Sequence, residues 1–263
     1  MTNWELFESQ CRSYLKEKFH LKDDEIILKG GSDSTSADIK IKTRLGDWIN
    51  IEAKMPDAQA GQFVVLPQEN KFTFSTRNKS EVKWAKDIIN YLNRNYNEFK
   101  LLSTKGKEIE LDNGILAEWI KNYYKNKKNT VFFITSFENE MVIFPTEKLE
   151  KYFEISACLR IKKSGSGDPS KNNIHELTKI PGVKDNDLVN KGKKWFANFK
   201  NPESEKFILS GSLYRYQFCK VEDGSFNIRR LGNTNNANVI FSLHSKKGQD
   251  FEDLEIFRKA ILE

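Results

Sequence analysis

Residues 30–62 read GGSDSTSADIKIKTRLGDWINIEAKMPDAQAGQ. Isoleucines alternate with polar residues on both sides of a polar turn at 43–47. Period-two alternation is typical of half-buried strands, and a polar turn that contains a glycine suits a hairpin. We therefore predict two short strands joined by this turn, followed by a helix from Ala58 to Leu66.

Charged side chains lie on the polar face of these two strands. Residues two apart in a strand point the same way, so Glu52 and Lys54 share a face, and pairing around the turn brings Asp38 to it. Two carboxylates that close together repel each other unless a cation lies between them. Hard oxygen ligands suit Mg²⁺, and a lysine beside the metal can orient an attacking water and offset charge that grows on a phosphate.

The order of these residues resembles the catalytic core of the PD-(D/E)XK nucleases: Asp38, then thirteen residues, then Glu52-x-Lys54. Ala37 stands where the superfamily name has a proline, but that proline does no chemistry. Alone the motif is weak, because an acid two residues before a lysine is usually part of a solvated strand face. The Ser- and Gly-rich segment before Asp38 and the layout of the strands favour the nuclease interpretation.

Segments across most of the chain are similar to the HhaI-like type II restriction endonucleases. They are MTNWELFESQCRSYL, GSDSTSADI, IEAKMPDAQAGQF, LLSTKGK, FFITS, VIFP, RIKKSGS and NTNNANVIFS. The resemblance implies an enzyme that cuts duplex DNA at GCGC, together with a DNA methyltransferase that protects host sites. It also implies that Asp38, Glu52 and the carbonyl of Ala53 bind Mg²⁺, while Lys54 orients the water and cleavage leaves 5′-phosphate and 3′-hydroxyl ends.

Three further residues are possible accessory groups at this site. Many nucleases of the superfamily carry an accessory glutamate on the first helix, which makes Glu8 the candidate; an ordinary solvent-facing acid is the alternative. Gln59 and Gln62 are three apart, so they share one side of the predicted helix and could touch the scissile phosphate or nearby bases. Plain polar surface is the alternative for both.

Composition limits the class of protein. With 263 residues, 38% apolar and 30% charged, and a mean hydropathy of −0.64, we expect a soluble globular chain. No apolar run approaches the roughly 18 residues that span a membrane. Three scattered cysteines suggest buried thiols in a cytoplasmic protein, and three isolated histidines argue against a histidine metal site. A net charge of +6 favours an acidic partner.

The segment from Arg160 to Lys200 holds ten Lys and Arg against four acids, an excess that equals the whole net charge. A basic, loop-rich segment is a candidate phosphate-contact surface, with a solvated lysine face as the alternative. Reading G·C pairs in the major groove requires Arg or Lys for guanine and oxygen acceptors for cytosine. The DNA-binding candidates are Arg160, Lys162, Lys163, Ser164, Ser166, Asp168, Asn233, Asn235, Asn236 and Asn238.

The remaining pattern predicts an α/β fold. The apolar run at 130–136 (TVFFITS) is typical of a central strand covered on both faces, and helices are expected at 80–99 and 113–127. Short β runs return after Lys206, whereas 164–200 has little periodicity. We predict a restriction-endonuclease-like core with a mixed central sheet flanked by helices at 1–155. A β-rich DNA-recognition region at 156–263 is expected to pack against it.

Two other functions fit the same residues. A repair or junction-resolving nuclease on this core would cut by DNA structure and not by sequence. A non-catalytic DNA-binding protein would keep the fold without the chemistry, although the intact Asp38, Glu52 and Lys54 argue against it.

Overall fold

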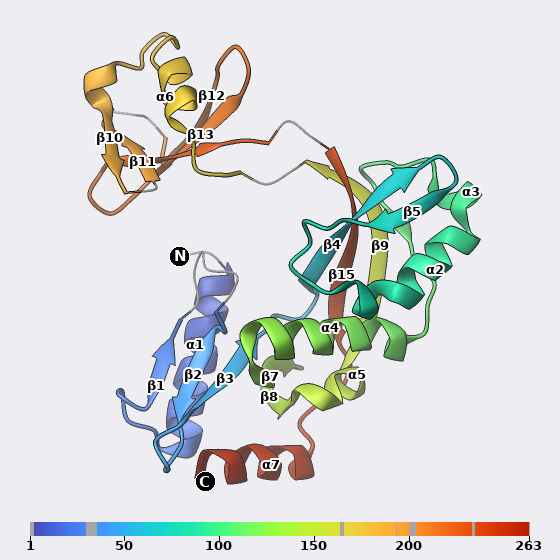
Figure 1. Cartoon of the computed structure of the whole chain (residues 1–263). Coiled ribbons are helices and arrows are strands. Elements are labelled where there is room, and N and C mark those ends of the chain that lie inside the picture. The colour runs from blue at the N-terminus through green and yellow to red at the C-terminus, as the bar shows by residue number, and fades with distance from the viewer. Residues whose placement is uncertain are drawn as a thin grey trace. The chain divides into compact units, whose positions relative to one another are not determined.

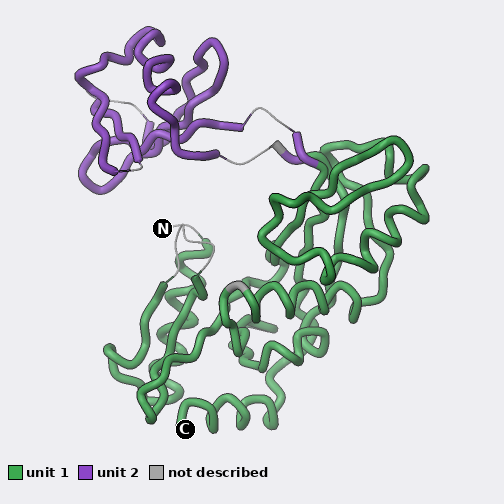
Figure 2. The backbone as a smooth tube through the Cα atoms, in the orientation of Figure 1, with its two compact units in different colours: residues 1–161, 237–263 green, residues 162–236 purple. Residues whose placement is uncertain are grey.

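The computed structural model describes residues 3–29, 36–163, 166–192, 194–199, 204–232 and 235–262. The chain forms two compact units, one of residues 1–161 with 237–263 and one of residues 162–236 (Figure 2). The C-terminal residues 237–263 thus belong with the N-terminal unit. The assignment of catalysis to residues 1–155 and of DNA recognition to residues 156–263 stays a prediction.

The first sheet of unit 1 carries the predicted hairpin (Figure 1). Its strands, in spatial order, are β1 (Ile26–Leu28), β2 (Ile39–Lys42), β3 (Trp48–Ala53), β7 (Thr130–Phe137) and β8 (Glu140–Pro145). β2 and β3 are antiparallel, with Ile39 opposite Ile51, whereas β3 and β7 are parallel. The hairpin and the mixed central sheet are therefore confirmed.

Strand β7 is buried on both faces, as its apolar sequence predicts. Phe132 and Ile134 pack in a core with α1 (Asn3–Phe19) and α7 (Phe251–Leu262), while Phe133 packs in a second core with α4 (Asn113–Lys128). Alternate residues of a strand point to opposite faces, so helices cover this sheet on both sides. Burying each such side chain contributes about 1.5–3 kcal/mol to folding.

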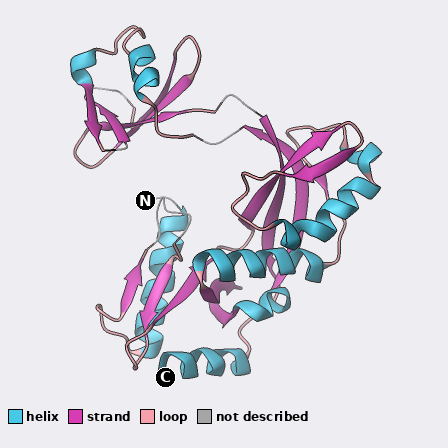
Figure 3. Cartoon of the chain, in the orientation of Figure 1, coloured by secondary structure: helices cyan, strands magenta, loops and turns pink. Residues whose placement is uncertain are grey.

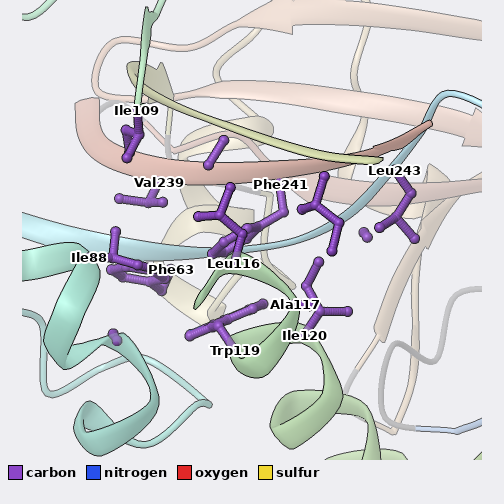
Figure 4. Packing of buried hydrophobic residues seen from close by; sticks show 14 of the residues in the cluster. Phe63, Ile88, Ile109, Leu116, Ala117, Trp119, Ile120, Val239, Phe241 and Leu243 are labelled. Atoms are coloured by element: carbon purple, nitrogen blue, oxygen red, sulfur yellow. The ribbon is translucent and has the colours of Figure 1, made fainter. Parts of the chain in front are cut away.

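The second sheet of unit 1 is built from segments far apart in sequence. Its strands, in spatial order, are β5 (Lys71–Phe74), β4 (Ala58–Gln68), β15 (Asn235–Ser245), β9 (Phe153–Lys163) and β6 (Lys107–Glu108). Figure 4 shows Trp119 of α4 against Phe63 of β4 and Phe241 of β15, with ring centroids 5.6 and 4.4 Å from the indole. Ile88 of α2 (Lys86–Arg94) lies in the same core.

The smaller elements of unit 1 lie between these strands and helices. They are the single turns η1 (Val82–Ala85) and η2 (Thr146–Lys148) and the short helices α3 (Tyr96–Phe99) and α5 (Leu149–Tyr152). The helix predicted at 80–99 is thus divided into η1, α2 and α3, whereas the one predicted at 113–127 is confirmed as α4. No helix within the described residues is long and apolar enough to cross a membrane.

The helix predicted at 58–66 is wrong, because these residues form strand β4, which pairs with β15 and turns back into β5. Gly61 adopts φ +137°, and a Cβ there would lie 2.9 Å from the Trp119 ring, so the backbone suits glycine in a strand and not a helix. The register skips Ala60, which is a β-bulge. This bulge puts Gln59 and Gln62 on one side of the strand.

Unit 2 is an antiparallel five-stranded sheet with the helix α6 (Lys171–Leu177) and the turn η3 (Asp185–Asp187) (Figure 3). Its strands, in spatial order, are β10 (Leu188–Lys191), β11 (Lys194–Ala197), β14 (Phe226–Arg230), β13 (Arg215–Lys220) and β12 (Lys206–Ser210). Tyr216, Phe218, Phe226 and Ile228 form its core with α6. The β-rich character is as predicted, but α6, β10 and β11 lie where the sequence shows little periodicity, because each is too short for a clear pattern.

Candidate active site

The hairpin brings together the three side chains of the predicted motif. Asp38 directly precedes β2, Glu52 lies near the end of β3, and Lys54 follows that strand. The backbone N–H of Ala53 donates to Asp38 Oδ2 at 3.0 Å. Lys54 Nζ lies 2.5 Å from Glu52 Oε1 and 3.9 Å from Asp38 Oδ2. The three groups are therefore adjacent, while their catalytic role stays a prediction.

A cavity of about 360 Å³ opens onto these groups. Its walls include Asp38, Glu52, Ala53 and Lys54, Trp4 and Glu8 from α1, Gln59 from β4, and Tyr123, Tyr124 and Lys128 from α4. Glu8 and Gln59, both predicted as accessory residues, thus face the site. Gln62 is not part of the wall, and its side chain accepts a hydrogen bond from Gln59 Nε2 at 3.3 Å.

Lys128 is a residue that the sequence analysis missed. Its Nζ lies 2.8 Å from Glu52 Oε1 and 2.9 Å from Glu52 Oε2. The Tyr124 ring lies between the two lysines, with its centroid 5.4 Å from Lys54 Nζ and 5.2 Å from Lys128 Nζ. Lys128 ends a lysine-rich stretch, 121–128, and nothing in the sequence distinguishes it from its neighbours.

Burial and charge shift the ionisation of the site. Burial, and then the neighbouring charge of Glu52, raise the pKa of Asp38 to about 7. Burial also raises the pKa of Glu8. Burial alone would lower the pKa of Lys54, but Glu52, Tyr124 and Asp38 raise it well above its usual value. Lys54 therefore keeps its positive charge at neutral pH, whereas Asp38 holds its proton to a higher pH than an exposed aspartate does.

The donor set of this cavity fits a hard divalent ion. In the described part of the chain, no three His, Cys, Asp or Glu side chains are grouped so that they could hold a metal. A metal here would depend on two carboxylates, Asp38 and Glu52, and on the carbonyl oxygen of Ala53. Oxygen donors of this kind suit Mg²⁺, which keeps several waters when few protein ligands are present. Burial and the charge of Glu52 raise the pKa of Asp38 by more than Lys54 and Lys128 lower it.

The predicted DNA-binding residues are spread over several elements. Arg160 and Lys162 lie on β9, and Asn235, Asn236 and Asn238 lie on β15, where Asn238 is buried. In unit 2, Arg229 donates to the carbonyl of Ser166 at 3.0 Å and lies 3.9 Å from the carboxylate of Asp168. Ser164, Asn233 and the side chain of Lys163 lie outside the described residues.

Comparison with known proteins identifies the family. The chain is similar to a solved structure of HhaI endonuclease in complex with DNA, with 35% sequence identity over 99% of each chain and a TM-score of 0.79. No family model matches the chain, and no curated protein matches it. The similarity extends over both compact units and includes the hairpin that carries Asp38, Glu52 and Lys54. The chain therefore belongs to the HhaI-like family of restriction endonucleases.

Proposed function

We propose that this chain is a type II restriction endonuclease that uses Mg²⁺ to hydrolyse duplex DNA at GCGC. The observation that carries the proposal is the convergence of Asp38, Glu52 and Lys54 on one open cavity. The similarity to HhaI endonuclease, whose solved structure is a complex with DNA, supports both the reaction and the substrate. A cognate methyltransferase and a cytoplasmic location belong to the same proposal.

Each group of the site has a role in this reaction. Asp38, Glu52 and the Ala53 carbonyl would hold the metal, and the Ala53 N–H fixes the orientation of the Asp38 carboxylate. When bound, a divalent ion lowers the pKa of a water and offsets the charge that develops on the phosphate. Lys54 has three N–H donors and uses one on Glu52, so it retains donors for the attacking water and a phosphate oxygen. In-line attack then leaves a 5′-phosphate and a 3′-hydroxyl.

Charge distribution supports binding to a polyanion. Residues 162–236 contain 14 Lys and Arg and 8 Asp and Glu, while the rest of the chain contains 29 of each kind. The whole net charge of +6 therefore lies in unit 2. Each lysine or arginine that neutralises a phosphate steepens the salt dependence of DNA binding by about 0.9 in log–log slope. We expect Arg160, Lys162 and unit 2 to supply such contacts.

Digestion of plasmid DNA with and without Mg²⁺, followed by mapping of the fragment ends, tests the proposal. We expect discrete fragments that end at GCGC with 5′-phosphates, no cutting in a chelator, and no cutting by the Lys54→Ala variant. Mg²⁺-dependent cutting without discrete fragments would favour a structure-specific repair nuclease instead. DNA binding without any cutting would favour a non-catalytic DNA-binding protein.

A further inference from the structure

Lys128, the last residue of α4, contacts both carboxylate oxygens of Glu52. Lys128 Nζ lies 2.8 and 2.9 Å from Oε1 and Oε2 of Glu52, whereas Lys54 contacts Oε1 alone. Glu52 is fully buried and the Lys128 side chain is 9% exposed. Neither oxygen of Glu52 is therefore available to another cation without displacing or sharing an ammonium group.

The backbone fixes the position of Lys128 relative to the strand that carries Glu52. Asn129 ends α4 in the left-handed conformation, with φ 49°, and its N–H donates to the carbonyl of Tyr124. The side-chain amide of Asn50, on β3, donates to the carbonyl of Lys128 at 2.8 Å. The helix end is thus tied to β3 two residues before Glu52, and the Tyr124 ring supports the ammonium from one side.

Two ammonium groups already offset part of the acidic charge of the cavity, whose wall also contains Glu8. Two ammonium groups, Lys54 and Lys128, face two acidic groups, Asp38 and Glu52, and Lys54 alone contacts both acids. A divalent ion at Asp38 and Glu52 would meet a fixed positive charge less than 3 Å from the oxygens that it needs. At such separations, unlike charges attract and like charges repel strongly even with substantial screening.

We propose that Lys128 is a positioning residue that fixes both oxygens of Glu52 and competes with the divalent ion for them. It keeps the carboxylate in place before the metal arrives, and it lowers the affinity of the DNA-free protein for metal. This inference rests on the proposed function in one respect, that the cavity takes a divalent ion. Lys54 cannot substitute for it, because Lys54 contacts only one oxygen of Glu52.

Titration of the DNA-free protein with MnCl₂, with free Mn²⁺ followed by electron paramagnetic resonance, tests this role. We expect Lys128→Met, which keeps the length and apolar stem of the side chain, to bind Mn²⁺ at least about tenfold more tightly than the wild type, because one repelling charge is removed. Lys128→Arg should bind Mn²⁺ as the wild type does. DNA cleavage by Lys128→Met should be slower by about tenfold or more, since Glu52 loses one of its two anchors.

Lys125→Met is the matched control, because Lys125 lies on the same helix, is half exposed and pairs with Glu147 away from the cavity. It should leave both Mn²⁺ affinity and cleavage unchanged. If Lys128→Met does not fold, as judged by thermal unfolding in a chelator, Lys128→Gln takes its place. A merely structural lysine would leave Mn²⁺ affinity unchanged or lower it when replaced.

Unchanged or weaker Mn²⁺ binding by a folded Lys128→Met or Lys128→Gln would overturn the inference. In that case a wild type that still binds Mn²⁺ and cuts DNA would leave the proposed function standing. A wild type that binds no Mn²⁺ and cuts no DNA would instead overturn the metal site itself, and the inference with it.

Discussion

Two buried glutamates, one in each compact unit, show opposite uses of the same side chain. Glu52 in unit 1 has no exposed surface, and its charge is met by the ammonium groups of Lys54 and Lys128. Glu176 in unit 2 is 9% exposed, and its partners are uncharged donors. Those donors are the backbone N–H groups of Leu213 and Tyr214 and the hydroxyls of Ser212 and Tyr216.

The two carboxylates differ in the kind of partner that offsets their burial. Burial alone would raise the pKa of Glu176, but its hydrogen bonds outweigh burial and lower it. Three of those donors belong to the loop between β12 and β13, and Tyr216 lies on β13 itself, so Glu176 fixes this hairpin to α6. Glu52 lines a cavity instead, and its partners are the ammonium groups of Lys54 and Lys128. A buried acid is thus a candidate for chemistry when its partners are charged and it lines a cavity.

Replacing each glutamate by glutamine should have the largest and most unequal effect on the rate of DNA cleavage. Glu52→Gln removes a proposed metal ligand, so we expect the single-turnover rate to fall at least about a thousandfold, which corresponds to about 4 kcal/mol. Glu176→Gln should stay within about threefold of the wild type at saturating DNA. Quenched-flow assays on a duplex with one GCGC site measure both rates. A Glu52→Gln rate above one tenth of the wild-type rate would contradict the assignment.

The pH dependence of stability should distinguish Asp38 from an ordinary carboxylate. Its folded-state pKa is raised to about 7, so the folded protein holds this proton more tightly than the unfolded chain does. The free energy of unfolding is therefore higher at low pH, and it falls as the pH rises from about 4 to about 7. Asp38→Asn lacks this loss. In a chelator, its free energy of unfolding should gain about 3 kcal/mol on the wild type between pH 5 and pH 8, at 1.36 kcal/mol per pKa unit.

Urea unfolding at a series of pH values measures this difference. Adding Mg²⁺ at pH 8 should reduce it, because a bound cation stabilises the charged carboxylate of the wild type only. Parallel pH profiles for the two proteins would mean that folding does not raise the pKa of Asp38.

Glu176→Gln should lower the stability of unit 2, although it leaves DNA cleavage nearly unchanged. A glutamine cannot accept from all four donors, and a buried donor left unpaired costs about 1–3 kcal/mol. We expect the free energy of unfolding of unit 2 to fall by about 2 kcal/mol. Hydrogen exchange followed by mass spectrometry should show faster exchange in β12, β13 and α6, with the strands of the catalytic sheet unchanged. Equal protection in both proteins would contradict a structural role for Glu176.

The smallest expected effect is at the wall of the cavity. Gln59→Ala removes a polar side chain that faces the site, so we expect cleavage to slow by about tenfold, or about 1.4 kcal/mol. Gln62→Ala, on the same side of β4 but outside the cavity wall, is the matched control and should slow it by less than about threefold. Equal effects at both positions would remove the distinction between them.

The parts of the structure that the sequence predicts are those set by short-range pattern. The hairpin follows from isoleucine alternation around one turn, and it alone places Asp38 beside Glu52 and Lys54. The central position of β7 follows from a dense apolar run. Such signals need no knowledge of distant segments.

The parts that the sequence does not predict depend on residues far along the chain. β4 is a strand because it pairs with β15, about 180 residues later, and the bulge at Ala60 arises only in that pairing. Its short apolar and alanine-rich sequence suits a helix equally well. Lys128 reaches Glu52 because β7 pairs in parallel with β3, which brings the end of α4 beside that strand. Nothing in the local sequence distinguishes Lys128 from the other lysines of residues 121–128.

A crystal structure of the protein soaked in MnCl₂, with the anomalous signal of manganese, shows directly whether Asp38, Glu52 and Ala53 hold a divalent ion. We expect a manganese peak in the cavity, bound by carboxylate oxygens of Asp38 and Glu52 and by the carbonyl oxygen of Ala53, with Lys54 beside it. A cavity without manganese when the ion is saturating, or manganese held by other residues, would contradict this expectation.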